Sequence, residues 1–295
     1  MTDRETHIPL SVVISTTKEP CSVIRDFDGL RRQLSAINGQ LIVISRVAPA
    51  SAIPPDASVH HVAGGSIFDC RAAALSLASG DIVALTEDHC VHPPDWCERI
   101  LHNFSKRPDL VLLGGAVANG STRSIEDLMS YWMTFSAFAP GQVIARHPCT
   151  AQFIVKAAAI DRRLKTGELE NALVQKLQAI PDAVYIDPEL IVRHDQSHGF
   201  WNTFVIHFHN GRAAGGFAPQ RIDNRNAPFL QCLAWGWQDV AAHFRRSKAA
   251  FQAGQMPLLV RTGYFTLILP LLVAHGIGAV VGYRKGPGVS PHHLV

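Results

Sequence analysis

The chain lacks the cysteine spacing that marks a zinc ribbon or a disulfide framework. Its six cysteines are scattered over 295 residues and form no CxxC pair, so neither kind of site is indicated. The apolar stretch of a secretory signal is also missing from the first ten residues, MTDRETHIPL. We therefore expect a reducing, cytoplasmic setting, with any membrane contact made by a later segment.

Charged residues are scarce too. Asp, Glu, Lys and Arg make up 17% of the chain, and the formal net charge is +3. Because nucleic-acid binding depends on a dense basic surface that neutralises phosphates, we expect no nucleic-acid partner. The hydrophobic content of 47% is enough for one large core, and it predicts a single α/β domain with an appendage rather than two equal domains.

Strands and helices alternate over the first part of the chain. Short β-branched runs, typical of strands buried on both faces, occupy residues 10–15, 41–45, 81–85 and 110–117. Helices are expected between them, over 24–34, from a capping box at Ser66 and Asp69 to Ser79, and after Pro93. Strands that alternate with helices predict a largely parallel sheet.

The order of elements is less regular after Gly141. We expect a strand at 153–155, a helix at 169–179, and two short strands at 184–186 and 190–192, separated by Asp187-Pro188. His207 and His209 lie on an expected aromatic-rich helix, which either lines an acceptor site or packs on the sheet. Packing is the favoured interpretation.

The composition changes toward the C-terminus. From Phe200 onward apolar and aromatic residues dominate, and residues 229–244 have one apolar helix face, which suits a membrane surface. Residues 263–283 form a run of 21 without formal charge, near the length of one bilayer crossing, yet the run contains a proline, a histidine and four glycines. We expect an α/β domain over residues 1–222 and a hydrophobic, membrane-associated helical segment over 223–295.

The most informative segment follows the strand expected at 81–85, where Thr86-Glu87-Asp88-His89 precede a proline-marked turn. In α/β sheets, ligands bind at the carboxyl ends of strands. Two carboxylates and an imidazole supply the donors that suit Mn²⁺ or Mg²⁺, and such a cation neutralises a diphosphate. The alternative is that Glu87 and Asp88 cap the turn while His89 packs locally.

In their order along the chain, several short motifs resemble glycosyltransferase family 2. Members of that family show an apolar strand ending near Pro-Thr, an Arg-Asn helix start, an Asp-Asp-Asp-like metal motif, Pro-x-x-Trp, a glycine-containing loop, a Glu-Asp motif and a late histidine. The corresponding residues here are Ser15-Thr16, Arg71-Ala72, Glu87-Asp88-His89, Pro93 to Trp96, Gly114-Gly115, Gly167 to Glu170, and Asp187-Pro188 followed by Val192-Arg193-His194. The resemblance spans roughly residues 8 to 220.

The resemblance implies a GT-A fold, which is a twisted, mixed and mostly parallel sheet flanked by helices, followed in this chain by C-terminal hydrophobic helices. It also implies a nucleoside-diphosphate sugar as donor. The implied donor-binding residues are Ser15, Thr16, Arg71, Glu87, Asp88, Gly114 and Gly115. The implied ligands of a divalent cation, Mn²⁺ or Mg²⁺, are Asp88, His89 and His194.

The same resemblance implies that Glu170, at a helix start, is the general base that removes the proton of the acceptor hydroxyl, and that the transfer inverts the anomeric centre. Glu168 is the alternative base. Both acids also have a simpler interpretation, because the helix dipole stabilises a carboxylate in the first turn whatever the function. His194 likewise is either a metal ligand or a packed residue.

The chain departs from the family pattern at three places. Ser45-Arg46 end the second strand, where the family has an aspartate that contacts the nucleotide, so the base of the donor is left open. His89 replaces the last aspartate of the metal motif, which lowers the negative charge and favours Mn²⁺, with transfer that needs no metal as the alternative. The Gln-x-x-Arg-Trp motif of processive synthases is missing at Gln220-Arg221, which favours transfer of a single sugar.

Together these features predict an inverting transferase that moves one sugar to a lipid-linked or cell-envelope glycan acceptor on the cytoplasmic side of the cell membrane. A rival interpretation is a catalytically inactive family member that binds a nucleotide sugar or a partner at the membrane. A dinucleotide-binding oxidoreductase is disfavoured, because residues 16–20 stand where GxGxxG would follow the first strand. A membrane scaffold leaves the acidic groups at the strand ends unexplained.

Overall fold

The computed structural model describes residues 7–50, 56–141, 143, 145–160, 174, 176–177, 180–252 and 258–294. Contacts between residues divide the chain into two units. The first contains Met1–Ala116 and Ala145–Arg193, and the second contains Val117–Ile144 and His194–Val295. The boundary predicted between residues 222 and 223 lies inside the second unit. That the glycosyltransferase-like part of the chain ends at this boundary stays a prediction.

The first unit is built on one sheet with the strand order β3-β2-β1-β4-β7-β6-β8-β5. The strands are β1 (Leu10–Thr16), β2 (Gln40–Ser45), β3 (Ala57–His61), β4 (Ile82–Glu87), β5 (Cys90–Val91), β6 (Leu112–Asn119), β7 (Gln152–Lys156) and β8 (Val184–His194). The strands β1 to β4 pair in parallel, whereas β7 is antiparallel to both β4 and β6. The sheet is therefore mixed and mostly parallel, as predicted.

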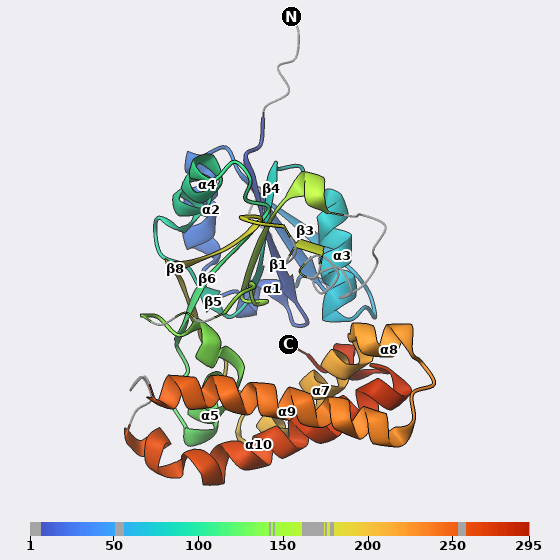
Figure 1. Ribbon diagram of the computed structural model, residues 1–295. Coiled ribbons are helices and arrows are strands. Elements are labelled where there is room, and N and C mark those ends of the chain that lie inside the picture. The colour runs from blue at the N-terminus through green and yellow to red at the C-terminus, as the bar shows by residue number, and fades with distance from the viewer. Residues whose placement is uncertain are drawn as a thin grey trace, which may run out of the picture. The chain divides into compact units, whose positions relative to one another are not determined.

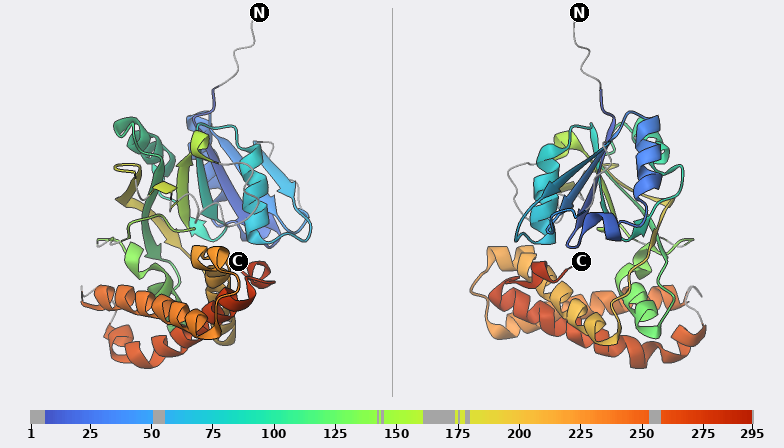
Figure 2. Two further views of the ribbon diagram at one scale, coloured as in Figure 1. Left: turned by 45° about the vertical axis from the view of Figure 1, so that its right-hand side comes forward. Right: turned by 180° about the vertical axis from the view of Figure 1, so that it is seen from behind.

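Helices cover both faces of this sheet. They are α1 (Pro20–Val23), α2 (Phe27–Ala36), α3 (Ile67–Leu77) and α4 (Trp96–Lys106), with a 3₁₀ turn at Ala157–Ala159. Helix α3 lies on one face, and α2 and α4 lie on the other (Figure 1, Figure 2). The predicted capping box begins α3, because the Asp69 N–H donates to Ser66 Oγ over 3.2 Å and the Ser66 N–H donates to Asp69 Oδ2 over 2.7 Å.

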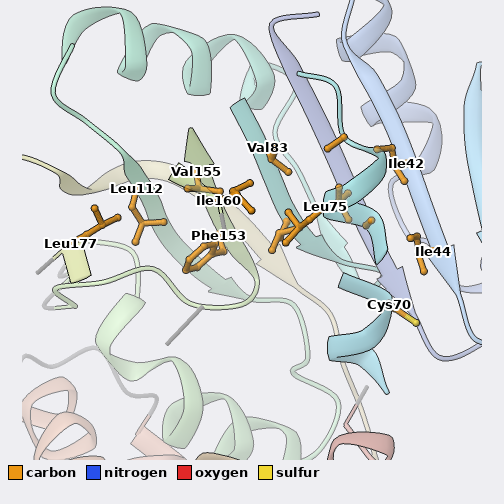
Figure 3. Close-up of a cluster of buried hydrophobic side chains, with 14 of the residues drawn as sticks. Ile42, Ile44, Cys70, Leu75, Val83, Leu112, Phe153, Val155, Ile160 and Leu177 are labelled. Atoms are coloured by element: carbon orange, nitrogen blue, oxygen red, sulfur yellow. The ribbon is translucent and has the colours of Figure 1, made fainter. Parts of the chain in front are cut away.

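The β-branched runs form the hydrophobic core of this unit. Nearly every residue of β1, β2 and β4 is buried, which confirms that these strands are covered on both faces. Figure 3 shows Ile42, Ile44 and Val83 of the strands gathered with Cys70 and Leu75 of α3. This packing fixes α3 against the sheet and thereby places the residues of its first two turns.

Three strands differ from the prediction. Strand β8 is continuous, where two short strands were expected around Asp187-Pro188. Pro188 has no backbone N–H to donate to a neighbouring strand. It is tolerated because one neighbour of β8 is β5, which is only two residues long and pairs with a short part of β8. Strands β3 and β5 were not predicted, since neither contains an apolar run of strand length. The helix expected at 169–179 lies largely outside the described residues.

The second unit is helical. Its helices are α5 (Ile125–Phe135), α7 (Phe200–Phe217), α8 (Pro219–Asp223), α9 (Phe229–Gln252) and α10 (Leu258–Lys285), with 3₁₀ turns at Ser136–Phe138 and Ser290–His292. Helix α10 contacts α5, α7 and α9. Its approach to α7 depends on glycine, because a Cβ at Gly211 would lie 2.0 Å from the carbonyl oxygen of His275. No described helix is long and apolar enough to cross a membrane.

Three histidines, of which His207 and His275 are buried, lie where these helices meet. His207 Nε2 of α7 is 3.0 Å from Ser130 Oγ, and the rings of His243 in α9 and His275 in α10 have centroids 4.4 Å apart. Arg246 Nη2 lies 3.0 Å from His243 Nδ1. Burial, and then neighbouring positive charge, lowers the pKa of all three histidines, to about 3 for His207 and to about 4 for His275. His207 is therefore packed, as favoured from the sequence, but its contact is with helix α5 and not with the sheet that was expected.

We expect acid to destabilise the second unit. An unfolded histidine takes up a proton near pH ~6.5, whereas folded His207 and His275 stay neutral because their pKa values are about 3 and about 4. The stability that depends on the neutral rings is therefore complete above pH ~6.5 and is lost as the pH falls from there, by up to about 1.4 kcal/mol per pH unit for each histidine. Urea unfolding followed by circular dichroism over this pH range measures the slope.

The variant His275→Gln should flatten that slope, since it removes one of the groups that take up a proton only in the unfolded chain. The matched control is His102→Gln, which changes an exposed histidine of α4 and should leave the slope as in the wild type. Equal slopes in the wild type and in His275→Gln would contradict the assignment of acid sensitivity to this cluster.

Candidate active site

Three parallel strands end at the same edge of the sheet. In the register of β1 with its neighbours, Thr16 is opposite Ser45 of β2, and Ser15 is opposite Glu87 of β4. Asp88, the residue after Glu87, therefore comes level with Thr16. Because α/β sheets bind ligands at the carboxyl ends of their strands, this edge is the place where the predicted acidic segment meets β1 and β2.

Glu87, Asp88 and His89 form a turn in which the side chains contact one another. His89 Nδ1 is 2.7 Å from Asp88 Oδ1, and His89 Nε2 is 3.2 Å from Glu87 Oε2. Thr16 Oγ1 donates to the other oxygen of Asp88 over 2.5 Å. The Arg25 N–H donates to the Asp88 carbonyl oxygen over 2.9 Å. The three side chains of the turn thus form one network, which is anchored to β1.

Arg71 of α3 contacts this network through Glu87. Its Nη2 donates to Glu87 Oε1 over 3.3 Å, and the arginine is buried. The guanidinium also lies over the Phe68 ring, 6.0 Å from its centroid. A fixed positive charge therefore stands beside the acidic segment, as the resemblance implied for a residue that binds the donor. Contact between Arg71 and a donor stays a prediction.

His89 carries a proton at neutral pH in this network. Burial disfavours the charged ring, but the hydrogen bonds with Asp88 and Glu87 and their negative charges outweigh burial and raise the pKa of His89 to about 9. An imidazolium cannot ligate a metal ion, so a cation that binds His89 has to displace this proton. A proton and a divalent cation therefore compete for a ring nitrogen of His89.

His194, the late histidine predicted as a ligand, is the last residue of β8. It belongs to the second unit, so its role as a ligand stays a prediction, whereas Glu87 Oε2 and His89 Nε2 of the first unit lie 3.2 Å apart. Carboxylate and imidazole donors at this spacing fit Mn²⁺. The prediction named Asp88 in place of Glu87, but the two oxygens of Asp88 contact Thr16 and His89. The role of Asp88 as a direct ligand stays a prediction.

The serines at the ends of β1 and β2 have different surroundings. Ser45 Oγ donates to the Lys18 carbonyl oxygen over 2.8 Å and accepts from the Val47 N–H over 3.0 Å. Ser45 therefore joins the two loops that follow β1 and β2, at the place where the family has an aspartate. Ser15 Oγ is buried without a hydrogen-bond partner among the described residues. Donor binding by Ser15 stays a prediction.

Gly114 and Gly115 lie inside β6, as the strand predicted over 110–117 implied, and not in a loop like the glycine-containing loop of the family. A Cβ at Gly115 would lie 2.0 Å from the carbonyl oxygen of Leu190, and a Cβ at Gly114 would lie 2.9 Å from Pro148 Cα. Close packing around β6 therefore accounts for both glycines. Their assignment as donor-binding residues stays a prediction that rests on the resemblance.

Gln152 is a buried polar residue that the sequence analysis did not single out. Its Nε2 donates to the carbonyl oxygens of Ala116 and Leu190, over 2.7 and 3.0 Å. Its Oε1 accepts from the Trp96 indole N–H over 3.3 Å. Gln152 thus ties β7 to β6, β8 and α4, and it helps to place the strand that ends in His194. A single glutamine before the run FIVK matches no motif, so only its burial identifies it.

Asp187 and His209, which the sequence analysis also named, have hydrogen-bond partners outside the turn at 87–89. Asp187 accepts from Arg99 Nε over 2.8 Å and from Asn103 Nδ2 over 2.8 Å, so it joins β8 to α4. Arginine and asparagine together outweigh burial and lower the pKa of Asp187. His209 Nδ1 lies 2.9 Å from Ser290 Oγ. Both residues have packing partners, and for His209 packing was the favoured interpretation.

Both candidates for the general base lie outside the described residues. Glu168 and Glu170 fall in the interval 161–173, together with the rest of the motif at 167–170. The helix start that was expected to present Glu170 falls in the same interval. The assignments of Glu170 as base and of Glu168 as its alternative therefore stay predictions.

Comparison with known proteins gives a match in this part of the chain. Residues 68–162 match the family described as Glycosyl transferase family 2. A segment of 47 residues is 36% identical to the glucosyl-dolichyl phosphate glucuronosyltransferase of Haloferax volcanii. That segment covers 16% of this chain and only 15% of the relative's length.

The fold resembles that of the mannosyltransferase PcManGT from Pyrobaculum calidifontis, which was solved in complex with GDP-Man and Mn²⁺. The TM-score is 0.53 at 14% identity, and the likeness covers 93% of this chain and 88% of that chain. At this identity it concerns the fold alone. Arg71 and the turn at 87–89 both fall within the family match. The resemblance read from the sequence is confirmed: residues 68–162 match glycosyltransferase family 2, and the chain has a fold of the GT-A type.

Proposed function

We propose that the protein transfers a single sugar, with inversion, from a nucleoside-diphosphate sugar to a lipid-linked or cell-envelope glycan acceptor. The observation that carries the proposal is the buried network of Arg71, Glu87, Asp88 and His89 at the carboxyl end of β4, inside the family match. The matched relative is named for a glucosyl-dolichyl phosphate, and the relative in fold binds GDP-Man and Mn²⁺. These names support a nucleotide-sugar donor and a lipid-linked acceptor.

A divalent cation, Mn²⁺ or Mg²⁺, belongs to this proposal, with Glu87 and His89 of the first unit as residues that would hold it and His194 as the further ligand that the resemblance implied. When bound, such a cation stabilises the negative charge that develops on a departing diphosphate. Asp88, held by Thr16, orients the ring of His89 through its hydrogen bond, as second partners of ligating histidines do.

The proposed reaction is a single displacement. The hydroxyl oxygen of the acceptor attacks the anomeric carbon of the donor sugar, the bond from that carbon to the diphosphate oxygen breaks, and the nucleoside diphosphate leaves with the electron pair. Glu170 accepts the hydroxyl proton, with Glu168 as the alternative base. Arg71 contributes a positive charge beside Glu87 for the diphosphate. Attack opposite the leaving group inverts the anomeric centre.

We also propose that the protein works at the cytoplasmic face of the cell membrane. Large apolar side chains of the second unit are exposed, among them Trp201, Leu230 and Leu258. Residues 195–295 contain nine Lys and Arg but three Asp and Glu, and basic residues are attracted to anionic lipids. A protein held on such a surface meets a lipid-linked acceptor in two dimensions. The rival proposal, a catalytically inactive family member, has the same surface but no turnover.

Nucleotide binding tests the donor site. We expect calorimetric titration with UDP and GDP to show that one of them binds in the presence of Mn²⁺ and that this binding disappears without it. The variant Glu87→Gln removes the charge of a proposed ligand and should weaken the metal-dependent binding about 10- to 100-fold. The control Glu98→Gln, at an exposed position of α4, should bind as the wild type does.

If the wild-type protein binds neither of these nucleotides nor any other nucleoside diphosphate, the proposal of an active transferase fails. The inactive family member, which binds a partner at the membrane, then becomes the better interpretation. Equal weakening by Glu87→Gln and Glu98→Gln would instead show that the nucleotide responds to overall charge and not to this site.

Hydrolysis of the donor sugar, with water as acceptor, tests the base. With a sugar donor that carries the nucleotide identified by titration, Glu170→Gln should lower turnover by about 10²- to 10⁴-fold, because proton removal from the attacking oxygen is lost. Its nucleotide affinity should stay unchanged, and Glu168→Gln should keep most of the activity. The reverse pattern would give the role to Glu168, and full activity in both variants would exclude both carboxylates.

A further inference from the structure

An apolar groove runs between α9 and α10, which lie side by side in Figure 1. Its volume is about 680 Å³, within the range of roughly 300 to 1,000 Å³ that is typical of small-molecule sites. Its walls include Leu233, Trp237 and Phe244 of α9, and Leu269, Val273 and Ile277 of α10. None of the described side chains that line it carries a charge, so the groove suits a hydrocarbon.

The walls of the groove are exposed. Trp237 is 72% exposed, and Leu269 and Ile277 are 57% and 55% exposed. Folded proteins rarely leave a contiguous apolar surface of this kind in water, and where one occurs it marks a site of interaction. An exposed apolar surface of this kind is typical of interaction sites, and the chemistry of the groove indicates which partner fits it.

Two glycines form the floor of the groove. A Cβ at Gly236 would lie 2.5 Å from Val280 Cγ2, and a Cβ at Gly276 would lie 2.6 Å from Val240 Cγ2. The two helices thus approach closely at these points, and all four residues line the groove. Any larger side chain at either glycine would push the helices apart or fill the space, so the glycines keep the groove open.

Positive charges lie toward one end of the two helices. Arg245 and Lys248 are exposed near the end of α9, and Arg261 is in the first turn of α10. The Arg261 guanidinium is 5.8 Å from the ring centroid of Phe251, which places the end of α9 beside the start of α10. Asp239 is the only acidic residue in the two helices. An anionic group is therefore favoured at this end.

We propose that the groove binds the hydrocarbon chain of the lipid-linked phosphate acceptor, and that Arg245, Lys248 and Arg261 bind its phosphate. The identity of the ligand as acceptor rests on the proposed function, whereas the binding of an alkyl phosphate is a property of the groove alone. Uncharged walls that end at a group of cations match an amphiphile with one chain and one anionic head. Burial of the chain removes both its methylene groups and the exposed walls from water.

Decyl phosphate, used below its micellar concentration, is the probe for this site. We expect the full-length protein to bind it saturably in calorimetric titration and to give no heat with inorganic phosphate alone. Ile277→Glu places a carboxylate in the groove and should weaken binding at least about tenfold, because the charge would have to be buried by the chain. The matched control is Leu230→Glu, which changes an exposed residue of α9 that does not line the groove.

The head group is tested by the double variant Arg245→Ala/Lys248→Ala. It should weaken binding of decyl phosphate about two- to fivefold, as expected for exposed charges, and leave binding of decanol unchanged. The control variant Arg284→Ala/Lys285→Ala removes two cations from the other end of α10 and should bind decyl phosphate as the wild type does. Val273→Glu repeats the test of the groove if circular dichroism shows that Ile277→Glu does not fold.

Several results would overturn this proposal. Equal losses in Ile277→Glu and Leu230→Glu would show unspecific adsorption of amphiphiles. A dimer of the wild type that dissociates in Ile277→Glu, with decyl phosphate binding retained, would assign the groove to a second copy of the chain. Titrations with UDP and GDP keep the two proposals apart: nucleotide binding without decyl phosphate binding refutes the groove alone, and the opposite result refutes the donor site alone.

Discussion

The site depends on the burial of two adjacent carboxylates, Glu87 and Asp88, at the end of a central strand. A buried carboxylate is costly unless it is paired, and here each one has a partner from another element. Thr16 comes from β1 and reaches Asp88 because β1 and β4 are parallel and in register. Arg71 comes from α3 and reaches Glu87 because the capping box and the hydrophobic core fix where that helix starts and lies. Charge balance at the strand end is thus a consequence of sheet register and helix capping.

The formal charges of Arg71, Glu87, Asp88 and His89 explain how these residues can both stabilise the fold and serve the proposed chemistry. With His89 protonated, the positive charges of His89 and Arg71 balance the two carboxylates, and nothing remains to attract a diphosphate. In the proposed function His89 would lose this proton when a divalent cation is bound, and the network would then have a net positive charge. Because the residues are largely buried, that charge acts through a medium of lower dielectric constant than water, and its attraction for a diphosphate is stronger.

The sequence predicted the parts of the fold that depend on local pattern. The runs at β1, β2 and β4 are apolar and β-branched because both faces of these strands are covered, and the capping box at α3 is a local hydrogen-bond pattern. Glu87, Asp88 and His89 are adjacent in sequence, so their proximity was predictable. Gln152 and the glycines of β6 are different, because their roles arise from strands that only the tertiary structure brings together. No local signal reports such contacts.

Helix α10 is a second case in which the sequence alone does not predict the tertiary contacts. A helix that is apolar on all sides is expected to be buried on all sides. One face of α10 meets that expectation, since Gly278 and Gly282 allow backbone contact with Phe208 and Arg212 of α7. The face that bears Leu269 and Ile277 does not, because these side chains are exposed along the groove. Hydropathy alone cannot separate the two faces, since both are apolar in sequence. The exposed face is therefore the part of the helix that protein packing leaves unexplained, and a ligand of matching chemistry accounts for it.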